Sequence, residues 1–155
     1  MFQNYLLLIH PTFGVLGMMA AGWVFVDALN ASKDNEARIR TVSMLSAVLI
    51  WLAYIFAGWF YVVYYGGDKA IIKAGPWPWA HGLFMETKEH AFFLTLLLAT
   101  FLPIAAAGRV AESKAVRKVV LWSSAGVALL ALAMEGAGAV ISMGAKAAMA
   151  MQLGA

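Results

Sequence analysis

Four long apolar stretches constrain this chain more than any other feature of its sequence. They cover roughly residues 5–29, 41–66, 83–108 and 118–145. Each exceeds the ~20 residues that a helix needs to cross about 30 Å of hydrocarbon. Strands of a membrane barrel would alternate polar and apolar residues at every second position, and these stretches do not. The sequence therefore predicts four membrane-spanning helices in a single transmembrane domain, residues 1–155.

The composition supports an integral membrane protein of the all-α class. Hydrophobic residues make up 63% of the chain and charged residues only 12%, whereas a soluble domain carries about 25% charged residues. The absence of cysteine excludes disulfides, iron–sulfur clusters and covalently attached c-type haem. A net charge of +3 gives no argument for nucleic-acid binding. The expected surroundings are a lipid bilayer, and the oligomeric state is left open.

The links between the stretches predict the topology. Because the links are short, neighbouring helices should be antiparallel, which gives an up-down-up-down four-helix bundle. The second link is rich in proline and tryptophan, which indicates a semi-rigid segment at the membrane interface. The first and third links carry seven basic residues, against four on the opposite side: Lys33, Arg38, Arg40, Arg109, Lys114, Arg117 and Lys118, against Lys69, Lys73, Lys88 and Lys146. The positive-inside rule then places both termini outside, in the periplasm if the membrane is a bacterial inner membrane.

Three ionisable side chains share one depth within the apolar stretches, where they are costly unless they have a partner: His10, His90 and Glu135. At ~1.5 Å per residue, they lie about 28, 27 and 25 Å from the cytoplasmic boundary. The first and third helices run in the same direction and would be diagonal in the bundle. His10 and His90 are therefore predicted to reach one centre on the bundle axis.

Residues around the two histidines suggest how a ligand could be held. Gly14 and Gly17 share one helix face with His10, either as a groove for a flat ligand or as a surface for close helix packing. The carboxylate of Glu86 lies four residues before His90 and could fix the tautomer of its imidazole.

The sequence supports weaker predictions for Glu135 and for three further side chains. Glu135 and Tyr61 are candidates for hydrogen bonding to a ligand or for proton relay. Lys88 is expected at the wet entrance of the third helix. His81, in the second link, is expected to be solvated, or otherwise to be a third ligand or a proton-exchange group.

A small b-type cytochrome is the leading functional hypothesis. Haem b needs no cysteine, and its iron is commonly held by axial histidines. The arrangement of His10 and His90 is similar to that of small four-helix membrane cytochromes. This resemblance implies an oxidoreductase component that passes electrons between a membrane quinone and an outer-side redox protein, alone or within a larger respiratory complex. Three methionines are alternatives to one histidine ligand: Met85, Met134 and Met143. No catalytic residue is predicted.

Two alternatives remain open at this point. A non-haem site for iron, copper or zinc could use His10, His90, Glu86 and Glu135, a mixed nitrogen and oxygen set. The chain could also hold no cofactor and act as a proton-relay or accessory subunit, in which the ionisable residues pair with one another.

Overall fold

A computed structural model describes the backbone of residues 2–154 and the side chains of residues 5–154. Throughout this range the regular elements are helices, with no strand, which confirms the all-α prediction. The elements are α1 (Phe2–Leu29), α2 (Glu36–Val63), α3 (Tyr65–Ala74), the π-helix η1 (Ala80–Met85), α4 (Glu86–Ala106) and α5 (Lys114–Leu153).

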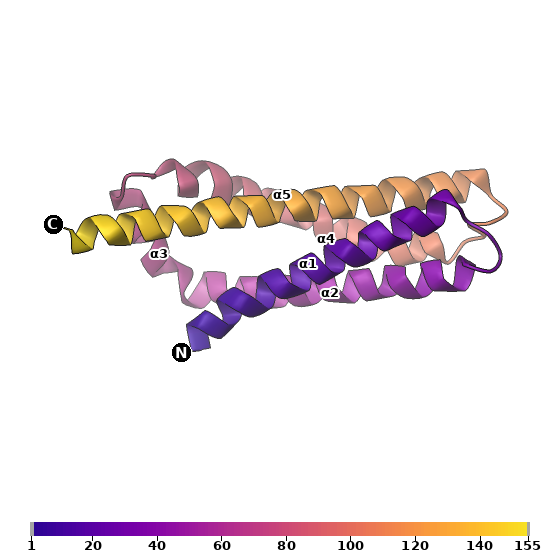
Figure 1. Cartoon of the computed structure of the whole chain (residues 1–155), viewed down its shortest axis with the longest axis horizontal. Coiled ribbons are helices and arrows are strands. Elements are labelled where there is room, and N and C mark those ends of the chain that lie inside the picture. The colour runs from indigo at the N-terminus through magenta and orange to yellow at the C-terminus, as the bar shows by residue number, and fades with distance from the viewer. Residues whose placement is uncertain (1, 155) are drawn as a thin grey trace.

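The long helices lie along one axis, with the two termini at the same end of the molecule (Figure 1). The connections 30–35 and 107–113 lie together at the opposite end. We call these the terminal end and the loop end. Helix α3 and η1 lie at the terminal end beside the last turns of α5 (Figure 1). Four segments are long and apolar enough to cross a membrane, which supports an integral membrane protein: Tyr5–Leu29, Glu36–Val63, Ala80–Ala106 and Lys114–Leu153.

The helix bounds differ from the predicted ones where polar residues join a helix. Helix α2 begins at Glu36 rather than at residue 41, because an acidic side chain in the first turn suits the positive end of the helix dipole. The second link is also more ordered than predicted. Its first half forms α3, which is amphipathic and buries Tyr65 and Ile72 against the bundle.

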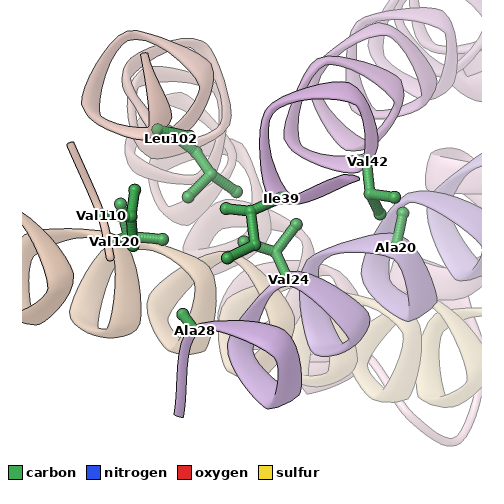
Figure 2. Close-up of a cluster of buried hydrophobic side chains, with 9 residues drawn as sticks. Ala20, Val24, Ala28, Ile39, Val42, Leu102, Val110 and Val120 are labelled. Carbon is green, nitrogen blue, oxygen red and sulfur yellow. The ribbon is translucent and has the colours of Figure 1, made fainter. Parts of the chain in front are cut away.

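Small apolar side chains fill the core at the loop end. Ala20, Val24 and Ala28 of α1 meet Ile39 of α2 and Leu102 of α4, and all five are buried (Figure 2). Lipid tails are as apolar as these side chains, so helix association in a bilayer depends on close packing rather than on removal of water. The alanines allow the helix backbones to approach.

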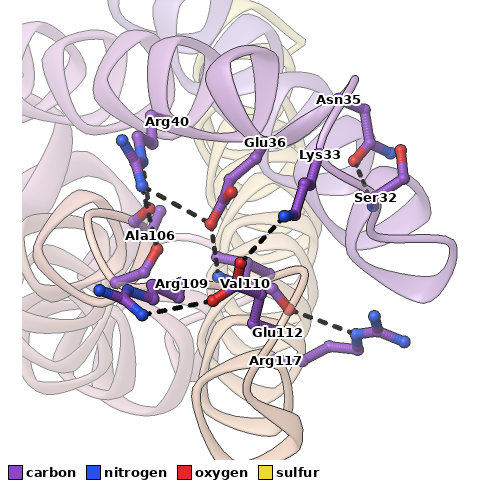
Figure 3. Close-up of polar contacts among 11 residues, drawn as sticks. Ser32, Lys33, Asn35, Glu36, Arg40, Ala106, Arg109, Val110, Glu112 and Arg117 are labelled. Carbon is purple, nitrogen blue, oxygen red and sulfur yellow. Dashed lines mark hydrogen bonds and ion pairs between the residues drawn. The ribbon is translucent and has the colours of Figure 1, made fainter.

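Polar contacts join the two connections at the loop end (Figure 3). A carboxylate oxygen of Glu36 accepts a hydrogen bond of 2.7 Å from the backbone N–H of Val110. The guanidinium of Arg117 donates to the carbonyl of Ala31 at 3.0 Å. Lys33 pairs with Glu112 at 3.3 Å, although both side chains are exposed and the pair contributes little stability. The hydrogen bonds from the Glu36 and Arg117 side chains to backbone groups therefore hold the loop end together.

A two-pronged ion pair joins α1 to α2 nearby. Arg38 donates from Nε to Oδ2 of Asp27 and from its terminal nitrogen to Oδ1, both at 2.7 Å. Asp27 is only 8% exposed. This bidentate geometry is the strongest form of a carboxylate–guanidinium contact and fixes both side chains.

Helices α1 and α2 approach closely where α1 carries Gly17. A methyl group built at Gly17 would lie 2.8 Å from Cδ1 of Ile50 and 3.2 Å from its backbone nitrogen. The hydroxyl of Ser46 donates to the Gly17 carbonyl at 2.9 Å. The Gly17 face is thus covered by α2, as expected for close helix packing.

We predict that Gly17→Val lowers the free energy of unfolding, because overpacking of a filled interface typically costs about 1–3 kcal/mol. Gly22→Val is the matched control, since nothing lies within 4 Å of a methyl group built at Gly22 on the same helix. Thermal unfolding in detergent, followed by circular dichroism, measures the difference. Equal unfolding temperatures for the two variants would contradict the close contact between α1 and α2.

Candidate functional site

Three ionisable side chains from different helices lie near one another in the half of the bundle toward the terminal end. They are His10 of α1, Lys88 of α4 and Glu135 of α5, and we call them the interhelical cluster. Lys88 interacts electrostatically with both of the others. A methyl group built at Gly138, one turn beyond Glu135, would lie 3.0 Å from Nζ of Lys88.

Glu135 lies against α1. A methyl group built at Gly14 would collide with its carboxylate oxygen Oε1, so a larger residue there would require the Glu135 side chain to shift. Gly14 lies one helical turn after His10 on the same face. Glu135 therefore meets α1 one helical turn from His10, whereas the sequence predicts the two residues at one depth.

The imidazole of His10 is held in one orientation. Its Nδ1 lies 2.9 Å from the carbonyl oxygen of Leu6, and because a carbonyl only accepts, Nδ1 must donate. The ring also stacks on Phe60 of α2, with centroids 6.5 Å apart and planes at 23°. In the neutral ring, Nε2 is consequently the nitrogen that carries the free lone pair.

Lys88 and Glu135 are close enough to interact but are not locked together. Among the side chains of residues 5–154, no ion pair within 4.0 Å involves either of them. Asp27 and Arg38 at the loop end are in direct contact at 2.7 Å. The interhelical cluster is thus an open arrangement of opposite charges, whereas the pair at the loop end is closed.

A cleft of about 300 Å³ between α4 and α5 reaches Lys88. Its walls are almost entirely apolar, and the exposed side chains of Leu83, Thr87 and Ala133 lie at its rim. A larger cavity of about 690 Å³ lies between α2 and α4, with Trp51 and Pro103 among its lining residues. No titratable group lines that larger cavity, whereas Lys88 lines the smaller cleft.

His90 occupies a different face of α4 from Lys88. Two residues correspond to about 200° of helix rotation, so the two side chains point to nearly opposite sides. The His90 side chain is exposed, and its Nδ1 donates to the backbone carbonyl of Glu86 at 2.7 Å. The carbonyl, rather than the predicted carboxylate, holds the ring. Shared ligation by His10 and His90 stays a prediction.

The other predicted site residues have structural neighbours. The face of α1 that carries Gly14 and Gly17 is occupied by Glu135 and Ile50, so side chains of this chain fill the groove considered for a flat ligand. Tyr61 is 38% exposed and stacks on Tyr65 with centroids 5.2 Å apart. Its hydroxyl is directed to the carboxylate of Glu89 on α4.

The expectation that His81 is solvated was wrong. Its side chain is only 2% exposed, and its Nδ1 shares a hydrogen bond of 3.0 Å with the hydroxyl of Tyr65. The reason is that α3 and η1 fold back over the terminal end and enclose the ring. The sequence offered one indication. His81 follows Trp77 and Trp79 and precedes an apolar run, and an imidazole in such surroundings can be buried if a tyrosine such as Tyr65 supplies a hydrogen bond.

The described side chains assemble no metal site, and the chain has no detectable similarity to known proteins. Within the described part of the chain, no group of three or more His, Asp or Glu side chains has a geometry that could hold a metal ion. The mixed site of His10, His90, Glu86 and Glu135 is therefore not assembled in this structure. No protein-family model, curated protein or solved structure matches the chain.

We predict that the stability contributed by Tyr65 depends on alkaline pH. Burial raises the pKa of its phenol above the ordinary value of about 10. The folded protein therefore holds this proton more tightly than the unfolded chain. The contribution is complete below pH ~10 and is lost as the pH rises above that value.

Tyr65→Phe tests this dependence. The variant should lose about 1–3 kcal/mol near neutral pH, because Nδ1 of buried His81 loses its partner, but its stability should fall less steeply above pH ~10. Tyr64→Phe is the control, since the Tyr64 hydroxyl has no hydrogen bond within residues 5–154. Chemical unfolding across alkaline pH measures both effects. Parallel pH profiles for wild type and Tyr65→Phe would show that the phenol is not the titrating group.

Proposed function

We propose that the chain is an integral membrane subunit that takes up and passes protons through the interhelical cluster. The observation that carries this proposal is the open arrangement of Lys88 and Glu135. A pair that serves only to hold helices together is expected in direct contact, as Asp27 and Arg38 are. A group that exchanges a proton must instead be able to change its charge without breaking the fold.

The remaining features of the cluster agree with proton transfer. Ionisable residues inside membrane proteins commonly form proton relays. His10 offers a nitrogen that can accept a proton, because its other nitrogen is held by Leu6. The cleft beside Lys88 connects the cluster to the outer surface of the bundle. Glu135 supplies the carboxyl group that gains or loses the proton.

Infrared spectroscopy of the purified protein tests this role. We expect the C=O stretch of a protonated Glu135 carboxyl group to appear as the pH is lowered, to shift in deuterated buffer and to be absent in Glu135→Gln. His10→Gln should slow the exchange, because the path loses its neighbouring proton acceptor. Glu112→Gln, at the exposed loop end, serves as the control and should change neither signal. A Glu135 band that does not exchange with deuterium would overturn the proposal.

A b-type cytochrome is the second candidate, and one observation favours it. Both His10 and His90 donate from Nδ1 to the carbonyl four residues earlier. This arrangement leaves Nε2 of each ring available to a metal. In this role the protein would carry haem b and pass electrons between a membrane quinone and an outer-side partner, within or outside a larger respiratory complex.

A visible spectrum of the purified protein separates the two candidates. Haem ligation by both histidines predicts a Soret band that disappears in His10→Ala and also in His90→Ala. A colourless protein without iron by elemental analysis would exclude the cytochrome and leave the proton-relay function unaffected.

We further propose that the loop end faces the cytoplasm of a bacterial inner membrane and that both termini face the periplasm. The excess of basic residues in the first and third links supports this orientation. The chain has no cysteine, so single cysteines can be introduced without background labelling. A membrane-impermeant maleimide should label Ala74→Cys in cells with a permeable outer membrane, and Asp34→Cys only after lysis. The reverse pattern would invert the orientation.

A further inference from the structure

The ammonium group of Lys88 lacks a close counter-ion of its own. In the part of the chain that the structure describes, it has no hydrogen bond and no ion pair within 4.0 Å. Glu135 acts on it only from a greater distance. A cation in apolar surroundings is costly unless an anion approaches and accepts its hydrogen bonds. The position of Lys88 therefore calls for an additional anionic group.

The cleft around Lys88 indicates the rest of such a ligand. It is lined by Leu83, Phe84, Leu130 and Met134, with the Thr87 hydroxyl as the other side-chain donor. A volume of about 300 Å³ is at the lower end of small-molecule sites, so it accommodates a head group and the first part of a chain. Leu83 of η1, Thr87 of α4 and Ala133 of α5 are exposed on the outside of the bundle. In a membrane this surface faces lipid.

We propose that this cleft binds the carboxylate of a long-chain apolar acid that enters from the bilayer. The carboxylate accepts hydrogen bonds from Lys88, the apolar walls contact the first methylene groups, and the remaining chain extends into the lipid. Charge complementarity selects a carboxylate over a neutral head group, because a hydrogen bond between two ionised groups is about twice as strong as a neutral one.

The proposal rests on the proposed proton-handling function in one respect. A carboxylate on one side of Lys88 repels the negative charge of Glu135 on the other side, so binding should be accompanied by uptake of a proton from solvent onto the Glu135 carboxylate. His10 on α1 is the third titratable group that faces this position. By linkage, proton uptake and ligand binding strengthen each other by the same factor. The site would then connect the protonation of the cluster to a molecule in the bilayer.

Binding of oleate, with oleyl alcohol as the neutral ligand of equal chain length, tests the proposal on the full chain in nanodiscs of uncharged lipid. We expect saturable binding of oleate that Lys88→Met weakens about tenfold or more, as removal of a charge-assisted hydrogen bond implies. Oleyl alcohol should bind weakly and without regard to Lys88. Lys146→Met is the matched control on an exposed lysine and should bind oleate like the wild type.

Two further variants keep the outcome decisive. Ala133→Leu fills the cleft without touching a charge and should also weaken oleate binding, which covers the case that Lys88→Met fails to fold. Glu135→Gln should bind oleate at least as well as the wild type but without proton uptake, so a failed proton relay and a failed binding site are distinguishable. Equal binding of oleate and oleyl alcohol, or of oleate to wild type and Lys88→Met, would overturn the carboxylate site.

Discussion

The absence of water from the hydrocarbon core is the constraint on which this structure depends. Every backbone polar group at membrane depth needs a partner within the protein, and a helix supplies one to each interior residue. Polar side chains obey the same constraint. Hydroxyl groups donate to the carbonyl four residues earlier on their own helix, as in Thr12, Thr95, Thr100 and Ser124. The apolar stretches can therefore contain hydroxyls without exposing an unpaired donor to lipid.

Charged groups cannot be satisfied in this local way, and the protein treats them differently at its two ends. At the loop end, Arg38 encloses the carboxylate of Asp27 with two short hydrogen bonds, and the pair serves to fix α1 against α2. Toward the terminal end, Lys88 and Glu135 remain apart beside a cleft. A closed pair stabilises a single arrangement, whereas an open pair keeps its charges available for a third group.

The sequence predicted the helices well because long apolar runs have few alternatives in a membrane. Depth along a helix was predictable to about one turn, since Glu135 contacts Gly14 rather than His10. Rotation was not. The π-helical turn Ala80–Met85 precedes α4, and its wider winding changes which residues face inward. Lys88 therefore lies in the cluster and His90 is exposed, an assignment that equal depth could not distinguish.

The length of α5 has a mechanical consequence. At ~1.5 Å per residue its 40 residues extend about 60 Å, roughly twice the thickness of the hydrocarbon. The same rigid rod carries Glu135 and, farther along, Gly144 and Ala148, which contact η1 and the segment after α3. A small rotation or axial shift of α5 is therefore felt at both places. Helix α5 is thus the element that the interhelical cluster shares with α3 and η1 at the terminal end.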